Sequence, residues 1–412
     1  MKRIGLVCLG LVLAANTASA QLTMQMSNGW TFSFAGNVNA FLYYENSNDG
    51  NTSTPGGLVP GGDALSQTRI TTGLLPAFAV FDAKGKEGNT DLSVHFGFAP
   101  QVNCAAGVND CFGAQIDMRQ VFLTVGGTWG QLLVGRELGV YQRQNILTDQ
   151  TLFGVGGTGQ GGPGTGAGTT LGRIGYGYVY PNFRAQMTYS TVAGRPYQLS
   201  IGVFEAASNG EYENIQLPRA EAEFTYAASG FKGWLGGSIQ STKTAPTGGE
   251  SLTAWGGAAG LRYERPQFSI TGSGYYGKGI GTTLFALGGS CSPVFLGGVP
   301  VANATCGANG SDDARDSYGY IGQITVTPPN SKVTIAGSYG SSILKSSDTE
   351  EAAGGTGEFK TENTLISGGV YFQATKSLKV VGEFNYTWTK DDIDATDKNT
   401  SIAPAFGFML FF

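Results

Sequence analysis

Apolar and polar residues alternate with a period of two along most of the chain, and this pattern constrains the fold more than any other feature. Leu92, Val94 and Phe96 share one face of a strand, and Ser93 and His95 share the other. Alternation of this kind indicates a β-strand whose two faces meet different surroundings. No helical periodicity stands out, and after the N-terminus no segment reaches the 18 or so consecutive apolar residues of a membrane helix. The chain is therefore predicted to be all-β.

Sixteen alternating segments can be recognised, and the links between them are short and long in turn. The segments are 30–44, 67–83, 90–101, 116–126, 130–138, 171–191, 197–206, 219–228, 234–243, 252–264, 267–278, 317–327, 332–344, 363–374, 378–389 and 400–412. Links such as 127–129 and 265–266 are short, whereas 139–170 and 279–316 are long. Short turns at one end and long loops at the other are typical of a transmembrane antiparallel β-barrel, with short periplasmic turns and long extracellular loops.

A soluble β-sandwich would also alternate, because it buries one face of each sheet and wets the other. Here the polar faces carry charge in mid-strand, as at Arg219, Glu221 and Glu223, while the opposite faces are aromatic and aliphatic. The pattern continues over one domain without a linker. Glycine is abundant at 66 residues, which suits a barrel of many short strands. We therefore expect a barrel with a wet lumen and a lipid-facing exterior.

The N-terminus has the features of a secretory signal peptide. Lys2 and Arg3 precede an apolar stretch over residues 4–15, and residues 18–20 (ASA) form a cleavage site. The apolar stretch is shorter than the ~20 residues that a spanning helix needs. We expect residues 1–20 to be removed and residues 21–412 to form the barrel.

Four cysteines remain after that cleavage, in a compartment where disulfides persist. Four cysteines allow three connectivities. Short loops close at the least entropic cost, so the spacing favours Cys104 with Cys111 and Cys291 with Cys306. No cysteine or histidine cluster has the spacing of metal ligands, so neither a metal nor another cofactor is expected.

Several segments resemble the Gram-negative trimeric general-porin family. They are residues 68–70 (TRI), 119–126 (RQVFLTVG), 130–136 (GQLLVGR), 171–176 (LGRIGY) and 180–183 (YPNF). The resemblance implies sixteen strands, a homotrimer, and a third loop folded into the lumen to form a constriction. In many porins basic residues on the wall face acids on that loop.

Matched position by position, the resemblance implies a basic wall of Arg69, Arg119 and Arg173, with Arg136 as a fourth candidate. Asp149 falls where the first acid of the third loop is expected, and the second acid is absent. The lumen elsewhere is mixed in charge. Its charged residues are Arg219, Arg262, Lys379, Glu221, Glu223, Glu264 and Glu383. A constriction with more positive than negative charge favours a weak preference for anions.

Two strands carry irregularities of phase. Arg119 shares its parity with the apolar Val121 and Leu123, which leaves its lumen-facing position open. In the segment 171–191 the apolar parity changes at Pro181 and Asn182. A bulge there would let both halves, including Tyr176, face lipid.

The predicted function is passive diffusion of small hydrophilic solutes and ions through a water-filled pore in the outer membrane of a Gram-negative bacterium. The alternative is a substrate-specific channel of the same membrane. An enzyme is disfavoured because the single histidine, His95, has no serine or aspartate motif around it. A net charge of −5 argues against nucleic-acid binding. The chain ends on Phe412, which resembles the signal that such barrels present to the barrel-assembly machinery.

Overall fold

The structure is a computed structural model in which part of the chain is described. The described residues are 22–27, 29–48, 50, 54–59, 64, 66–102, 116–157, 169–209, 212–243, 251–291, 294–296, 299–301, 313–353, 358–391 and 398–412. The predicted signal peptide, Cys104, Cys111 and Cys306 lie outside these residues. Cys291 is disulfide-bonded, and both predicted pairings stay predictions.

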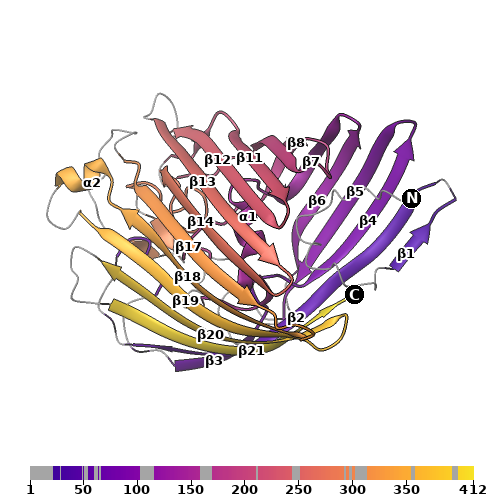
Figure 1. Cartoon of the computed structure of the whole chain (residues 1–412). Coiled ribbons are helices and arrows are strands. Elements are labelled where there is room, and N and C mark those ends of the chain that lie inside the picture. The colour runs from indigo at the N-terminus through magenta and orange to yellow at the C-terminus, as the bar shows by residue number, and fades with distance from the viewer. Residues whose placement is uncertain are drawn as a thin grey trace.

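Antiparallel strands close into a barrel of sixteen strand positions, as the sequence predicted (Figure 1). The strands of the barrel are β2 (Thr31–Ser47), β3 (Ser66–Thr71), β4 (Phe78–Glu87), β5 (Thr90–Pro100), β6 (Ile116–Gly127), β7 (Gly130–Leu138), β8 (Phe183–Ser190), β9 (Tyr197–Phe204), β11 (Arg219–Ala228), β12 (Phe231–Lys243), β13 (Ser251–Arg265), β14 (Phe268–Lys278), β17 (Asp316–Val326), β18 (Val333–Lys345), β19 (Lys360–Gln373), β20 (Leu378–Asp391) and β21 (Lys398–Phe411). The smaller elements are β1 (Leu22–Gln25), β10 (Asn214–Ile215), β15 (Val294–Leu296), β16 (Val299–Val301), α1 (Arg143–Thr148), η2 (Gln150–Phe153) and α2 (Asp348–Ala353). β2 pairs with β21 and closes the ring.

The two faces of the wall differ as the alternation requires. In β13, Trp255 and Leu261 are exposed on the outside, while Leu252 and Ala254 are buried inside. A continuous belt of exposed apolar side chains is unfavourable in water and favourable in lipid. Among the described residues, no helix is long and apolar enough to cross a membrane.

The second strand position is split, which corrects the single strand expected over 67–83. β3 and β4 both pair with β2, and residues 72–77 leave the wall between them. The side chains of Asn37 and Asn39 donate to the carbonyls of Pro76 and Leu75, and Asn39 accepts from the Gly73 amide. These amides satisfy backbone groups that lost their strand partners. The excursion is buried in the lumen.

The first and last strands of the described residues both pair with β2. β1 pairs with the start of β2, where Leu22 is opposite Phe34, and β21 pairs further along, where Phe411 is opposite Asn37. β1 therefore continues the line of β21. The backbone of Phe412 exchanges hydrogen bonds with Gly36, which fixes the last residue against the wall.

The sixth strand is shorter than predicted, because β8 begins only at Phe183. Residues 171–182 run inside the barrel, where Tyr176 and Tyr178 are fully buried rather than facing lipid. Gly172 and Gly175 adopt positive φ, so this segment turns instead of extending. Large residues alternating with small ones suit a lumen filler as well as a strand, which explains the wrong assignment.

Candidate pore constriction

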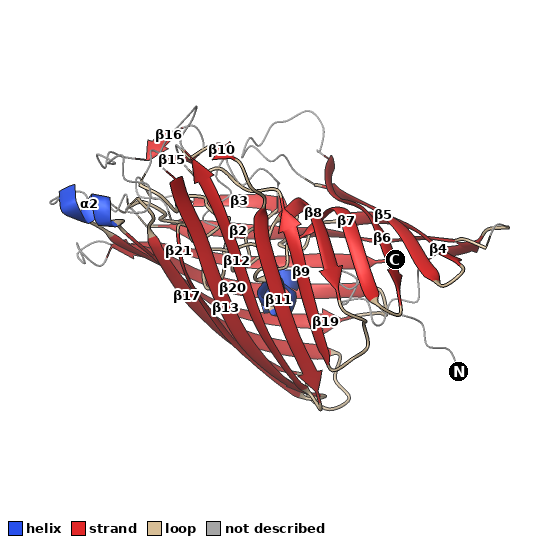
Figure 2. Cartoon of the chain, turned by 90° about the horizontal axis from the view of Figure 1, so that it is seen from above, coloured by secondary structure: helices blue, strands red, loops and turns tan. Residues whose placement is uncertain are grey.

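The third loop, described over residues 139–157 and 169–182, enters the lumen and spans it, as the resemblance implied. Figure 2 shows the blue helix α1 of this loop inside the ring of strands. The described parts of the loop bond to several walls. Gln323 of β17 accepts from the Gln150 amide and donates to the Thr148 carbonyl. The Trp234 indole of β12 donates to Asn145. The loop is therefore attached to the wall on more than one side.

Two carboxylates of β11 hold the start of the third loop. Glu221 accepts hydrogen bonds from the backbone amides of Val140 and Tyr141, each at 2.9 Å. Glu223 accepts from Arg143 at 2.5 Å and from Gln144 at 3.0 Å. Both acids are almost fully buried. Their charge is used to bind the loop and is not displayed to the pore.

Glu383 of β20 holds the middle of the loop in the same way. One oxygen accepts from the amides of Val155 and Gly156 at 2.7 and 3.0 Å, and the other accepts from the Tyr371 hydroxyl at 2.6 Å. The contact requires glycine at position 154, where a Cβ would lie 2.0 Å from Glu383 Oε1. The sequence placed Glu383 in the lumen but did not indicate this anchoring role.

The side of the loop that faces β2, β20 and β21 is apolar. Ile146, Leu152 and Val155 of the loop are buried in one cluster with Phe41 of β2 and Met409 of β21. Burial of such side chains stabilises by roughly 1.5–3 kcal/mol each. This part of the lumen is a packed core, not a water-filled space.

Arg173 and Asp149 lie together inside the loop, and neither faces an open pore. Arg173 belongs to the loop and not to a wall strand, which corrects its expected position. It is 0% exposed and donates to Ser338 of β18 and to the Leu365 carbonyl of β19. Burial lowers the pKa of its guanidinium, and the neighbouring Asp149 raises it.

Asp149 is a structural acceptor in the turn between α1 and η2. Oδ1 accepts from the amide and hydroxyl of Thr151, and Oδ2 accepts from the Tyr178 hydroxyl at 2.8 Å. Burial raises the pKa of this carboxyl, while Arg173 lowers it. Asp149 and Arg173 are thus electrostatic neighbours inside the loop, and their hydrogen bonds go to other residues.

A bulge decides the orientation of Arg119. Gly97 is opposite Gln120 and Phe98 is opposite Met118, so Arg119 is an extra residue in β6. The phase of the strand changes there, and Met118 and Leu123 are both exposed outside although their parities differ. Arg119 is thereby buried and bonds to Asp117 at 2.9 Å. A bulge explains how it leaves the outer face despite its parity.

Arg69 and Arg136 occupy different faces. Arg69 precedes the exposed Ile70 in β3, so it lies on the lumen phase, where it donates to Gln67. Arg136 is opposite Val121 and Ala185, on the outward phase of β7. The register does not support Arg136 as a lumen residue. The four arginines therefore do not form one basic wall.

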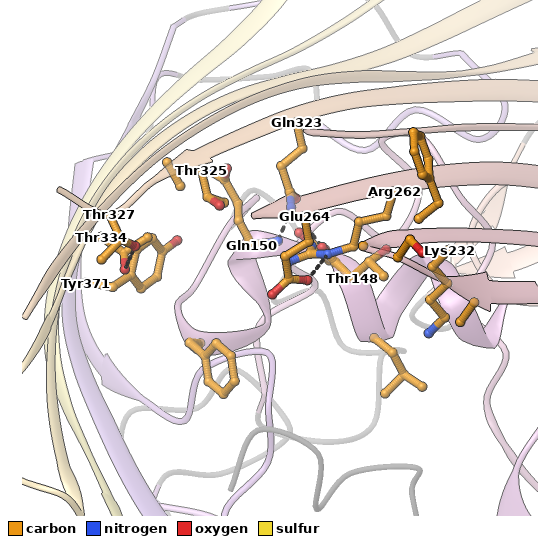
Figure 3. A pocket seen from close by; sticks show the side chains of 18 of the residues that line it. Thr148, Gln150, Lys232, Arg262, Glu264, Gln323, Thr325, Thr327, Thr334 and Tyr371 are labelled. Atoms are coloured by element: carbon orange, nitrogen blue, oxygen red, sulfur yellow. Dashed lines mark hydrogen bonds and ion pairs between the residues drawn. The ribbon is translucent and has the colours of Figure 1, made fainter. Parts of the chain in front are cut away.

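An open cavity lies on the other side of the third loop, toward the short turns (Figure 3). Its volume is about 810 Å³. The loop contributes Thr148, Gln150 and Phe153 to its lining. The rest comes from the wall, with β12, β13, β17 and β18 among the strands that contribute. The lining of the cavity includes the hydroxyls of Thr325, Thr327 and Thr334 and the amide of Gln323, all of which can bind water.

The architecture matches solved outer-membrane channels over nearly its whole length. The outer membrane channel DcaP of Acinetobacter baumannii is 14% identical, with a TM-score of 0.66 over 94% of this chain and 99% of that one. An anion-selective porin from Comamonas acidovorans is 13% identical, with a TM-score of 0.58 over 93% and 100%. OmpF of Salmonella typhi, in a complex with daunomycin, is 12% identical, with a TM-score of 0.53 over 94% and 100%.

The chain has the fold of a Gram-negative porin. No family model matches the sequence, and no curated protein matches it. At 12–14% identity the similarity establishes the fold of the barrel. What passes through this porin barrel must be argued from its own residues.

The charges of the cavity differ from those that the sequence singled out. Lys232, Arg262 and Lys379 line it, and among the described residues Lys232 and Lys379 form no ion pair. Arg262 pairs with the exposed Glu264 at 2.9 Å. Lys232 was missed because residues 230–233 were taken as a link between strands. The alternation of the exposed Phe231 and Leu235 is the signal that places it on the lumen face of β12.

His95 of β5 makes a buried pair with Asp82 of the neighbouring strand β4. Its Nδ1 lies 2.9 Å from Asp82 Oδ1, and its ring stacks on Phe122 at 4.5 Å. The sequence did not predict this pair. Nε2 is buried and has no hydrogen-bond partner in the described part of the chain. Among the described residues, no hydroxyl is bonded to this nitrogen, where a hydrolase places its nucleophile. No cluster of potential metal ligands occurs among the described residues.

Proposed function

We propose that this protein is an outer-membrane channel through which small hydrophilic solutes diffuse passively, with a weak preference for anions. The fold supports a channel, since the wall has an apolar exterior and a polar lumen. The preference for anions is supported by which charged residues of the lumen are bonded to the third loop and which are not. Glu221, Glu223 and Glu383 are buried and accept hydrogen bonds from the third loop, while Lys232 and Lys379 line the cavity and form no ion pair among the described residues.

Excess positive charge on a narrow aqueous path concentrates anions there. The similarity to an anion-selective porin agrees with this direction. The sequence suggested that the preference arises from Arg69, Arg119 and Arg173 facing Asp149. We now assign it to the cavity lysines Lys232 and Lys379. The test is the reversal potential of single channels in a gradient of potassium chloride. A modest anion preference is expected, and a strong cation preference would contradict the proposal.

A substrate-specific channel is the second candidate, and one observation favours it. Residues of the loop after β14 reach into the barrel and contact the third loop and the wall. The Thr283 carbonyl accepts from the Tyr180 amide, and the ring of Phe285 lies 4.7 Å from the Arg219 guanidinium. Such filling narrows the path. Liposome swelling with neutral sugars of rising size separates the two candidates. A general pore admits them in order of size, and a specific channel excludes most of them while passing a preferred solute.

We further propose that the chain is exported, loses residues 1–20 and assembles as a homotrimer in the outer membrane. The signal-like N-terminus and the terminal Phe412 support export and recognition by the barrel-assembly machinery. One of the similar solved structures, OmpT of Vibrio cholerae, is described in a trimer form. Fractionation and mild-detergent electrophoresis test this, and a native monomer would contradict the trimer.

A further inference from the structure

Two cations face each other directly on the wall of the cavity. Lys232 of β12 and Arg262 of β13 are register partners, and both point into the lumen. Directly opposed side chains on neighbouring strands lie about 4.5–5.5 Å apart at their Cβ atoms, and like charges at such positions destabilise the pairing. The carboxylates of Glu223 and Glu264 both act on Lys232, but among the described residues their ion pairs are with Arg143 and Arg262. A like-charged pair with unused donors is suited to share an anion.

The donors of this pair are only partly used. In the described part of the chain Lys232 makes no hydrogen bond or ion pair. Arg262 bonds through Nε to Glu264 and through Nη1 to Thr271 at 3.4 Å, and no partner of Nη2 occurs among the described residues. Glu264 is 61% exposed at its side chain, so its ion pair is screened by solvent and weak. Glu264 therefore competes with an incoming anion but does not cancel both cations.

The pair also lies near the wall residue that binds the third loop. Arg262 is opposite Thr271, and Thr271 is opposite Gln323, which is bonded to the third loop. The cations and Thr148 of the loop line the same cavity. Figure 3 shows Lys232, Arg262 and Glu264 around one side of the cavity and Thr327, Thr334 and Tyr371 on the other.

We infer that Lys232 and Arg262 form an oxyanion-binding subsite, which takes the carboxylate or phosphate group of a solute on the turn side of the third loop. Charged N–H donors bind oxyanions through short, charge-assisted hydrogen bonds, and a guanidinium and an ammonium are the groups that proteins use for this purpose. The inference deepens the proposed channel function and rests on it. It adds a solute class and a side from which binding occurs.

The test uses the full mature protein in detergent and inorganic phosphate as the probe, at constant ionic strength set with potassium chloride. Calorimetric titration is expected to show saturable binding. The double variant Lys232→Gln/Arg262→Gln should weaken it about tenfold. Lys243→Gln removes a lysine at the other end of the same strand and should leave the affinity unchanged. An acetate titration, with the same variants, tests the carboxylate arm.

The variant Glu264→Gln should change the phosphate affinity in the opposite direction. Removing the competing carboxylate should tighten phosphate binding about threefold, an outcome that misfolding cannot produce. Wild-type protein that does not bind phosphate, or a double variant that binds it as well as wild type, would overturn the inference.

Planar bilayers separate this inference from the proposed function. Phosphate added on the turn side should reduce the chloride current at lower concentration than phosphate added on the loop side. Anion-selective channels with no phosphate effect would remove the subsite and leave the channel function. Phosphate binding by a protein that conducts no ions would do the reverse.

Discussion

The two sides of the third loop have opposite chemistry. Toward β2, β20 and β21 the loop is sealed by apolar contacts, and Glu383 binds its backbone amides. On its turn side it borders an open cavity lined by Lys232 of β12 and by Lys379 at the start of β20, neither of which forms an ion pair among the described residues. Both sides are made of residues that look alike in the sequence, charged positions on the polar face of a strand. We therefore expect a lumen charge to affect permeation mainly where the third loop does not bind it.

The largest effect is expected from Glu383→Ala. It leaves two loop amides and the Tyr371 hydroxyl without an acceptor in a buried place, where each lost partner costs roughly 1–3 kcal/mol. We expect a loss of about 3 kcal/mol in unfolding free energy and a higher single-channel conductance as the loop loosens. Glu264→Ala, which removes an exposed carboxylate on the open side, is the control. Equal behaviour of the two variants would abolish the distinction between the two sides.

Arg173→Met should come next, because it keeps the length of the side chain and removes its donors to Ser338 and Leu365. We expect a loss of about 2 kcal/mol, measured by denaturant unfolding of the folded barrel. The reversal potential should stay as in wild type, since Arg173 is fully buried. A clear shift of the reversal potential in a folded variant would restore Arg173 to the pore wall.

Asp149→Asn tests the charge inside the loop. Burial raises the pKa of Asp149 above its usual 3.8, so the folded loop favours the protonated acid. The stability that this group contributes is full below that value and is lost as the pH rises through the raised pKa. The variant should lack this dependence and differ from wild type by less than about 1 kcal/mol near neutrality. Unfolding free energies at pH 3.5 and pH 6 measure the effect, and an unchanged slope would contradict the assignment.

Lys379→Gln should change stability least. Its ammonium lies 3.7 Å from the centroid of the Phe153 ring, a contact worth about 0.5–1 kcal/mol at a partly exposed site. The anion-to-cation permeability ratio should nevertheless fall about twofold, because the charge lines the cavity. Lys398→Gln is the matched control. Lys398 also lies over an aromatic ring, Trp388 at 3.9 Å, but is exposed away from the cavity. If both variants shift the ratio alike, the cavity does not set the preference.

The number and order of the wall strands could be predicted from the sequence, because each wall strand separates lipid from lumen and must alternate. Alternation gave a wrong prediction for residues 171–182, which it assigned to a wall strand. A segment packed inside the barrel can also alternate between large and small residues. Alternation also failed at residues 72–77, where Asn37 and Asn39 replace the missing strand partners. Alternation of apolar and polar residues indicates that a segment has two different surroundings. It does not indicate whether these are lipid and lumen or two packed parts of the protein.

The sequence by itself therefore determined the fold class, the strand count and the long third loop, because these follow from short-range alternation and loop length. The tertiary structure alone decided which charges face the pore. Arg119 turns inward through a bulge that only the register against β5 reveals. Glu221, Glu223 and Glu383 accept hydrogen bonds from loop residues that are 79 to 228 positions distant in sequence. Whether a charged side chain faces the pore or is buried depends on its neighbours. Those neighbours are brought together only when the barrel closes.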